Sequence, residues 1–377
     1  MPSYFHQYLL DELLSGVKPQ KVVVIYGPRQ VGKTTLLEHF LKSQTNYLLV
    51  SGDDIFVRHH LSSQSIDQLK EFVGGKSMLV VDEAQRIPHI GSNLKLLVDH
   101  CSHLSIVATG SSSFDLAQQM GEPLTGRKIT LQMYPLSQME LSAYEHVHQT
   151  EALRETRLLY GSYPEVVKMN NATDRREYLQ ELVRDYLFKD ILELDGVKQV
   201  NKITKLLQLL AFQIGKEVSS TEIAGHVGLS KNTVHRYLDL LEKSFVLVPL
   251  YGFSRNLRKE ITKMPKYYFY DVGVRNALIN QFNSLSVRQD VGDLWENYLV
   301  MERIKKMAYQ RIHKNYYFWR TYDQQEIDWV EEGDGMLHGY EFKWKEQTVK
   351  PPTSWQHAYP HAQFTTISSH HYLDFIT

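Results

Sequence analysis

The sequence has little of several features that define whole classes of protein. It has one cysteine in 377 residues, Cys101, and no apolar run long enough to cross a bilayer. A single cysteine forms no disulfide within the chain, which is typical of a reducing compartment. The amino terminus lacks the basic and then apolar pattern of a secretory signal. We therefore expect a cytoplasmic protein that does not bind or span a membrane.

An excess of charge of one sign is also lacking. The chain has 42 Lys and Arg against 43 Asp and Glu, so its formal net charge is −1, and no overall basicity indicates nucleic-acid binding. Hydrophobic residues make up 42% and charged residues 23%, which is ordinary for a globular protein. The length exceeds what one ordinary core accommodates, so we expect two or three domains.

The clearest feature that is present is a complete phosphate-binding loop. The pattern G-x-x-x-x-G-K-[ST] runs over residues 27–34, between an apolar run at 21–26 that predicts a buried strand and a stretch at 34–41 that predicts a helix. In that context the loop N–H groups and the helix N-terminus bind phosphate, whereas a chance loop before an ordinary helix is the alternative. The predicted nucleotide-binding residues are Gly27, Pro28, Arg29, Gln30, Val31, Gly32, Lys33, Thr34 and Thr35.

Four side chains are expected to act directly on the triphosphate and its metal. Lys33 should reach the β- and γ-phosphates, and the Thr34 hydroxyl should bind Mg²⁺. A second apolar run at 78–82 ends in Asp82 and Glu83, which is typical of a Walker-B strand. Asp82 is expected to hold Mg²⁺ opposite Thr34, and Glu83 to orient and polarise the attacking water. The two acids favour hydrolysis over mere binding, and an ordinary surface pair is the alternative.

The remaining apolar runs predict the fold around this loop. Runs at 46–51 and 105–110 alternate with helical stretches, which predicts an α/β fold with a parallel sheet. The run at 105–110 contains Thr109 near its end and is followed by Ser111, and both are candidates to contact the γ-phosphate or the attacking water. A simple turn of small polar residues explains these two positions equally well.

One arginine outside the loop is a candidate to complete the catalytic site. Arg127 follows Gly126 and precedes a predicted strand at 128–133. An arginine on such a turn can act as a finger on the γ-phosphate, in cis or from a neighbouring subunit. A solvated loop arginine is the competing interpretation, and Arg29 is a rival for the same role.

The middle of the chain predicts a helical lid or connector followed by a DNA-binding winged helix. A helix-turn-helix pattern at 219–243 is followed by two predicted strands joined by a basic loop. Residues 201–270 contain 11 Lys and Arg against 5 Asp and Glu, a local excess of +6 that favours contact with phosphates. Docking of a protein partner is the alternative. The candidate DNA contacts are Lys231, Asn232, His235, Arg236, Arg255 and Arg258.

The last third carries a second chemical signal. Predicted strands at 326–330 and 336–344, joined by a turn, would bring Asp328 nearly opposite Glu341, with Lys343 on the same face. A preceding helix could add Glu296. Carboxylates of this kind can hold a second divalent metal, and Lys343 can position water or steady phosphoryl charge. The constellation predicts a PD-(D/E)xK nuclease site, and a salt-bridged hairpin is the alternative.

The order of these motifs resembles a known architecture. The chain is similar to the prokaryotic AAA-type ATPases that carry a C-terminal PD-(D/E)xK nuclease-like domain of unknown function. This resemblance implies ATP rather than GTP, a P-loop core with an additional strand, a winged helix and a restriction-endonuclease-like C-terminal fold. It rests on Gly-Pro-Arg-Gln-Val-Gly-Lys-Thr-Thr, Val-Val-Asp-Glu-Ala-Gln, Thr-Gly-Ser-Ser-Ser, Leu-Thr-Gly-Arg, Tyr-Pro-Leu-Ser, Gly-Ser-Tyr-Pro-Glu and Glu-Ile-Asp…Glu-Phe-Lys, in that order.

These expectations define a domain plan and a leading function. We expect a P-loop ATPase core at 1–140, a helical lid at 141–210, a winged helix at 211–275 and a nuclease-like domain at 276–377. The leading hypothesis is a Mg²⁺-dependent ATPase whose nucleotide state gates a DNA-binding, DNA-cleaving C-terminal module. The alternatives are a nucleotide switch that grips a protein partner and a transcription regulator with an inactive nuclease-like domain. A homo-oligomer is compatible with each.

Overall fold

The chain folds into two compact units. The computed structural model describes residues 4–111, 124–184, 200–255 and 264–377. The N-terminal unit comprises residues 4–135 with 243–245, and the C-terminal unit comprises residues 136–242 with 246–377. Within the described part of the chain, no helix has both the length and the apolar character needed to span a membrane.

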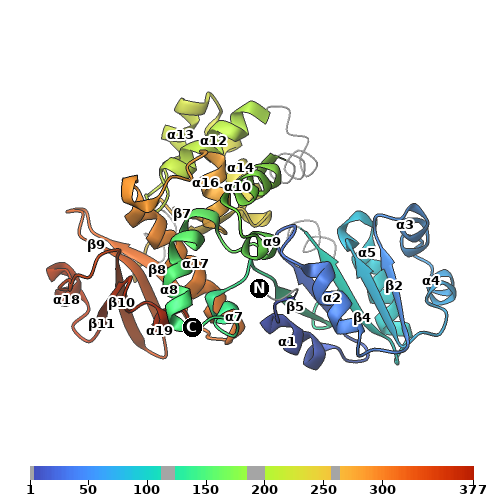
Figure 1. Cartoon of the computed structure of the whole chain (residues 1–377). Helices are drawn as coiled ribbons and strands as arrows, with labels where there is room; N and C mark the ends of the chain where they lie inside the picture. Colours follow the sequence, from blue (N-terminus) through green and yellow to red (C-terminus); the bar gives the residue numbers. More distant parts are fainter. Residues whose placement is uncertain (1–3, 112–123, 185–199, 256–263) are drawn as a thin grey trace. The chain divides into compact units, whose positions relative to one another are not determined.

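The N-terminal unit is built on a five-stranded, wholly parallel sheet in the order β2-β3-β4-β1-β5 (Figure 1, blue to teal). The predicted parallel α/β fold is therefore confirmed. The order also places β4 between the strand that leads into the phosphate loop, β1, and the strand that ends at Asp82, β3. The strands are β1 (Val22–Tyr26), β2 (Tyr47–Ser51), β3 (Met78–Asp82), β4 (Ser105–Gly110) and β5 (Lys128–Gln132).

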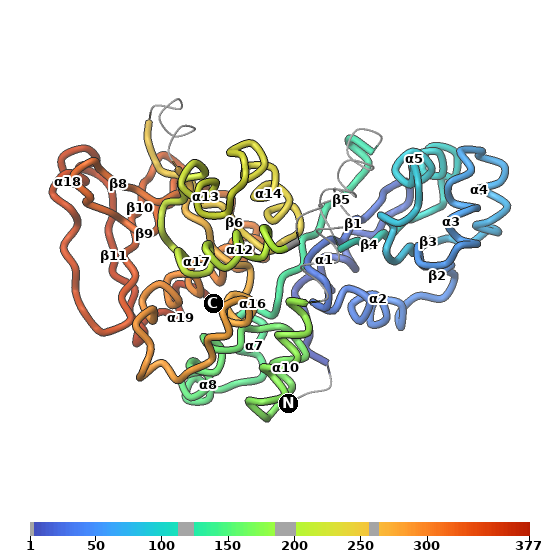
Figure 2. The backbone as a smooth tube through the Cα atoms, turned by 90° about the horizontal axis from the view of Figure 1, so that it is seen from above, coloured from blue at the N-terminus to red at the C-terminus, as the bar shows by residue number. Residues whose placement is uncertain are grey.

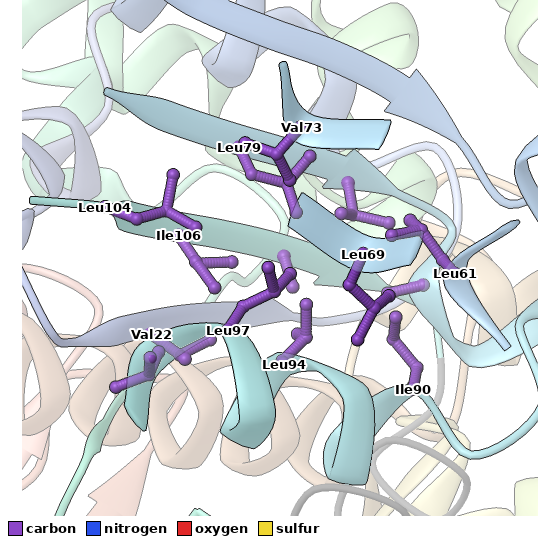
Figure 3. Packing of buried hydrophobic residues seen from close by; sticks show 14 of the residues in the cluster. Val22, Leu61, Leu69, Val73, Leu79, Ile90, Leu94, Leu97, Leu104 and Ile106 are labelled. Atoms are coloured by element: carbon purple, nitrogen blue, oxygen red, sulfur yellow. The ribbon is translucent and has the colours of Figure 1, made fainter. Parts of the chain in front are cut away.

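Helices connect these strands and supply the core. Apolar residues at positions i, i+4 and i+7 of α5, namely Ile90, Leu94 and Leu97, point toward β3 and β4 in Figure 3, where they meet Leu79 and Ile106. All five side chains are fully buried. The helices are α1 (Tyr8–Gly16), α2 (Lys33–Leu41), α3 (Ile55–Leu61), α4 (Ile66–Val73), the 3₁₀ turn Ala84–Arg86 and α5 (Ile90–His100).

The C-terminal unit begins with a run of helices, as the sequence predicts. Several of these helices lie within the helical region expected at 141–210, of which residues 185–199 lie outside the described residues. The elements up to the first hairpin are α7 (Gln138–Leu141), α8 (Val147–Tyr160), α9 (Pro164–Lys168), α10 (Ala172–Leu182), α12 (Val200–Phe212), α13 (Ser220–Val227) and α14 (Lys231–Lys243).

Helices α13 and α14 have the local chemistry that the sequence predicts. The Ser219 hydroxyl accepts the N–H of Glu222 at the start of α13, and the Ser230 hydroxyl accepts the N–H of Thr233 at the start of α14. Gly228 ends α13 in the left-handed conformation. An antiparallel hairpin follows, formed by β6 (Leu247–Leu250) and β7 (Lys266–Phe269).

A second sheet completes the C-terminal unit, with its strands side by side in the order β11-β10-β9-β8 (Figure 2, red). Strands β8, β9 and β10 are antiparallel, and β11 runs parallel to β10. Phe253 packs into the core of this sheet with Trp319 and Trp355. The elements are α16 (Val272–Leu278), the 3₁₀ turn Leu285–Val287, α17 (Val291–Tyr309), β8 (Asn315–Arg320), β9 (Glu326–Gly333), β10 (Met336–Lys343), α18 (Thr353–Ala358), β11 (Gln363–Ser368) and α19 (Leu373–Ile376).

Candidate functional site

The phosphate loop joins the carboxyl end of β1 to the N-terminus of α2. Two of its glycines are required by geometry. A Cβ on Gly27 would clash with the backbone oxygen of Met133, and Gly32 caps α2 with φ of 98°. Val31 is buried beneath the loop, whereas Thr34 and Thr35 are exposed on the first turn of the helix. The loop therefore presents backbone N–H groups at a helix N-terminus, which is the arrangement that binds phosphate.

Lys33 is folded back onto the loop that carries it. Its side chain is buried, and its ammonium donates to the backbone oxygens of Gly27 at 2.9 Å and Pro28 at 2.8 Å. Burial of an ammonium is tolerated only with such acceptors. The same group, held at the centre of the loop, is the one that would meet the phosphates of a bound nucleotide.

Residues from three segments meet at the carboxyl ends of the parallel strands. The Thr34 hydroxyl donates to Oδ2 of Asp82 at 3.0 Å, and the hydroxyl of Thr109 on β4 donates to Oδ1 of the same carboxylate. A hydroxyl paired with a carboxylate next to a phosphate loop is an oxygen ligand set that fits Mg²⁺. Thr34 and Asp82 would therefore hold the metal that accompanies a triphosphate, and Thr109 fixes the orientation of Asp82.

Glu83 is held by its backbone and by a neighbouring amide. Its φ of 51° and ψ of 42° lie in the left-handed region. Nε2 of Gln85 donates to Oε2 of Glu83 at 2.7 Å and to the hydroxyl of Ser111 at 3.0 Å. Gln85 had no role in the sequence-based prediction. Its signal was its place two residues after the Walker-B acids, within the stretch Val-Val-Asp-Glu-Ala-Gln.

Arg127 lies at the amino ends of the strands, whereas the phosphate loop lies at their carboxyl ends. Its backbone oxygen accepts the N–H of Val22, the first residue of β1, whereas the loop follows the last residue of β1. The five residues of β1 separate these two ends of the sheet, which corresponds to roughly 15 Å at the usual rise per strand residue. The guanidinium forms an ion pair with Asp99. An arginine at the amino ends does not reach the nucleotide of its own chain, so the expected finger in cis is not supported by this placement.

The predicted DNA contacts on α14 form one exposed side of that helix. Lys231, Asn232, His235 and Arg236 are exposed. The opposite side of α14 is buried, including Val234, Tyr237, Leu238 and Leu241. This division is what the sequence predicts for an amphipathic helix.

The hairpin loop is described only in part. Arg255 is exposed and its guanidinium carbon lies 5.6 Å from the ring centre of Tyr359. Arg258 lies outside the described residues. The local basic excess at 201–270 must be corrected for Lys266, which was counted in it. The Lys266 side chain is 1% exposed and paired with carboxylates, so it adds nothing to a basic surface.

The carboxylates of the C-terminal sheet adopt the register that the sequence predicts. Strands β9 and β10 pair up to Tyr340 opposite Trp329, which places Glu341 opposite Asp328. Oδ2 of Asp328 accepts the N–H of Phe342 at 2.8 Å. The ammonium of Lys343 donates to Oε1 of Glu341 at 2.6 Å. Asp328, Glu341 and Lys343 therefore gather on one face of the sheet.

A lysine from the hairpin enters the same cluster. The ammonium of Lys266 lies 3.1 Å from Oε1 of Glu296 on α17 and is also paired with Glu326 on β9. The hydroxyl of Tyr268 donates to the same oxygen of Glu296 at 2.6 Å. Together with Asp328 and Glu341, these side chains form what we call the carboxylate cluster: Glu296, Glu326, Asp328 and Glu341, with Lys266 and Lys343.

The electrostatics of the carboxylate cluster are those of a buried site with surplus negative charge. Burial raises the pKa of Asp328 well above its usual range, and the charges of Glu296 and Glu341 raise it further. Burial alone would lower the pKa of Lys266, but Glu296 and Glu326 outweigh it and raise that pKa. The lysine is therefore a permanent cation, and the cluster favours a proton on Asp328.

The predicted metal set of Glu296, Asp328 and Glu341 is not assembled. No group of three His, Cys, Asp or Glu side chains among the described residues has a geometry that could hold a metal ion. The physical reason is that ammonium groups hold the carboxylates, with Lys266 on Glu296 and Lys343 on Glu341. As folded here, the carboxylate cluster does not fit a divalent metal.

Three segments of the chain match known protein families. Residues 19–142 match an AAA domain, residues 151–285 match a domain of unknown function (DUF8612), and residues 291–364 match a second domain of unknown function (DUF4143). The first segment contains the phosphate loop and the whole parallel sheet. The N-terminal unit is therefore an ATPase-like P-loop domain.

The chain is also similar to particular proteins. An uncharacterized protein of Mycobacterium tuberculosis is 25% identical over 325 residues, which cover 85% of this chain and 70% of the relative. An uncharacterized protein of Methanocaldococcus jannaschii is 23% identical over 308 residues, covering 75% and 66%. Among solved structures, a Walker-type ATPase of Pyrococcus abyssi aligns with a TM-score of 0.49 and 16% identity over 73% of this chain and 96% of that one.

Proposed function

We propose that this protein is a Mg²⁺-dependent ATPase whose nucleotide state governs a DNA-binding C-terminal unit. The observation that carries the first half is the pairing of Thr34 with Asp82 at 3.0 Å beside a complete phosphate loop. When bound, Mg²⁺ would neutralise phosphate charge and orient the triphosphate. Glu83 would accept a proton from the attacking water, and Lys33 would stabilise charge on the β- and γ-phosphates.

The proposal is tested by nucleotide binding and hydrolysis in the same variants. Lys33→Ala should lose ATP affinity and turnover together, because the loop loses its cation. Glu83→Gln should retain ATP binding and lose hydrolysis by about 10²-fold or more, because general-base catalysis is removed. The matched control is Lys42→Ala, an exposed lysine that follows the same helix. ATP turnover in Lys33→Ala at the wild-type rate would refute the nucleotide site.

The DNA-binding half of the proposal is supported by the exposed side of α14. Lys231, His235 and Arg236 project from one helix whose opposite side is buried. Phosphate contacts release counterions, so binding to duplex DNA should weaken steeply with salt, and removing one contact should reduce the salt slope by about 1.

The experiment measures DNA affinity across a salt series with and without ATP. Lys231→Ala and Arg236→Ala should each weaken binding and flatten the salt slope. Lys70→Ala, an exposed lysine on α4, is the control. Affinity that does not respond to salt would favour the alternative, a nucleotide switch that docks a protein partner, and affinity confined to one sequence would favour a transcription regulator.

DNA cleavage is a second candidate function, favoured by the gathering of Asp328, Glu341 and Lys343 on two paired strands. It would require a divalent metal that the carboxylate cluster does not fit as folded here. Nicking that depends on Mg²⁺ or Mn²⁺ and is lost in Asp328→Ala would support it. Nicking that survives in that variant would arise from something else.

A further inference from the structure

Lys266 is placed in the carboxylate cluster by the backbone around it. It is the first residue of β7 and pairs with Leu250 across the hairpin. A second bridge joins its backbone to Glu217. The side chain is 1% exposed, and its ammonium lies 5.4 Å from the ring centre of Phe318 on β8. Lys266 is therefore a buried residue, with its backbone paired on two sides and its side chain shielded from solvent.

The carboxylates of the cluster are also held by other donors. Tyr268 donates to Glu296 at 2.6 Å, the backbone N–H of Phe342 donates to Asp328 at 2.8 Å, and Arg320 lies 3.4 Å from Glu326. The oxygens of Glu296 and Glu326 that pair with the ammonium are therefore held within the cluster, and the Asp328 carboxyl lies close enough to act on Lys266 by its charge. A rigid set of carboxylate oxygens closed around one cation is a cation site, whatever that cation is.

A divalent ion cannot share this position with the lysine. Mg²⁺ and Mn²⁺ bind carboxylate oxygens at about 2.1 Å, and the space in front of Oε1 of Glu296 is taken by the Lys266 ammonium at 3.1 Å. The surplus negative charge of the cluster is what keeps the buried ammonium charged. Removing the ammonium would leave buried carboxylates without their cation, which is the condition that draws a metal in.

We propose that the Lys266 ammonium occupies the cation position of the carboxylate cluster, so that the cluster excludes a divalent metal as long as β7 stays in place. This deepens the second candidate function, DNA cleavage, because it states what the cleavage site holds in the chain as folded here. It depends on neither ATP hydrolysis nor DNA binding.

The experiment counts bound Mn²⁺ by electron paramagnetic resonance in the full chain without nucleotide or DNA. All proteins carry Asp82→Asn, which removes the metal ligand of the N-terminal unit. With Lys266 present, we expect no Mn²⁺ binding that depends on Asp328. Lys266→Met should gain one site per chain, at least about tenfold tighter than any binding with Lys266 present, and adding Asp328→Asn should abolish it.

Two further variants separate the cation from the fold. Lys266→Arg retains a positive charge and should gain no site, and Lys343→Met leaves Lys266 in place and should also gain none. If Lys266→Met folds by circular dichroism and binds no Mn²⁺, the proposal is wrong. If Lys266→Met does not fold, Mn²⁺ binding to the Asp82→Asn protein that retains Lys266 tests the proposal. Tight Mn²⁺ binding there that Asp328→Asn removes would overturn the proposal, and its absence would support it.

Discussion

One amide joins Glu83 to Ser111. Nε2 of Gln85 lies 2.7 Å from Oε2 of Glu83 and 3.0 Å from the hydroxyl of Ser111, so a single side chain links the proposed base to the end of β4. The sequence predicts Ser111 as a candidate to contact the γ-phosphate or the attacking water. The geometry adds an indirect route, in which a phosphate that engages Ser111 would act on Glu83 through Gln85.

The first prediction concerns this link. Gln85→Ala should lower the ATP turnover number by about tenfold while changing ATP affinity little, because an orienting hydrogen bond to the base is lost and the phosphate loop is untouched. Steady-state hydrolysis and equilibrium binding of a fluorescent ATP analogue measure the two quantities. Gln44→Ala is the control, since Gln44 bonds to the neighbouring Ser43 at the surface. Equal losses in affinity and turnover would indicate a structural role.

The second prediction concerns Arg127. From the amino ends of the strands, Arg127 could act as a finger only on the nucleotide of a neighbouring copy. On that hypothesis Arg127→Ala should lose hydrolysis, and mixing it with Lys33→Ala, which is inactive but supplies the arginine, should restore it. The measurement is specific activity of the mixture at rising protein concentration. Asp99→Asn is the control for the ion pair that Arg127 makes within its own chain. A mixture no more active than the two separate variants would indicate that Arg127 has only a structural role, through its ion pair with Asp99.

The third prediction concerns Gly161. Its φ of 72° and ψ of −158° suit glycine alone, and a Cβ there would collide with the carboxylate of Asp271, which accepts the N–H of Ser162 at 2.7 Å. Gly161→Ala should lower the free energy of unfolding by about 2 kcal/mol or more. Gly225→Ala is the matched control. Gly225 lies within α13 with open space around it, so alanine should stabilise the protein by about 0.5–1 kcal/mol. Urea titration measures both.

The fourth prediction concerns the pH dependence of stability through Asp290. Burial opposes ionisation, but Arg288 and Arg275 outweigh it and lower the pKa of Asp290 to about 2. The unfolded chain then binds this proton at higher pH than the folded chain does. The stabilisation of about 2 kcal/mol is therefore complete above about pH 5 and is lost as the pH falls toward 2.

Asp290→Asn tests this by comparison with the wild type. The variant should be at least about 2 kcal/mol less stable at pH 7, because two buried arginines lose their anion. The difference in unfolding free energy should shrink between about pH 5 and pH 2. Asp323→Asn, at an exposed position, should change little across the range. A difference that stays constant with pH would contradict the assignment.

Local patterns in the sequence predict much of this fold. Four of the five strands of the parallel sheet, β1 to β4, are short apolar runs, and such runs can be recognised without any knowledge of their neighbours. The register of Asp328 against Glu341 was also predictable, because a tight turn fixes the pairing of the two strands that it joins. The phosphate loop needed only its own residues.

What the sequence does not reveal depends on contacts between distant segments. Lys266 precedes Glu296 by 30 residues and Glu326 by 60, so no local pattern could distinguish it from the solvated lysines of a basic loop. The same holds for Gln85, whose partner Ser111 comes from a separate strand. The end of the sheet at which Arg127 lies follows from strand direction, so that placement could have been worked out from a parallel sheet alone.

The left-handed backbone of Glu83 sets stability against activity at one residue. A non-glycine residue with φ of 51° carries a conformational cost of about 1 kcal/mol, which glycine or asparagine would relieve. A chain selected only to remain folded would therefore be free to drift at position 83 toward residues that cannot act as a base. Replacing Glu83 with glycine would therefore relax the backbone and remove the proposed base in the same step.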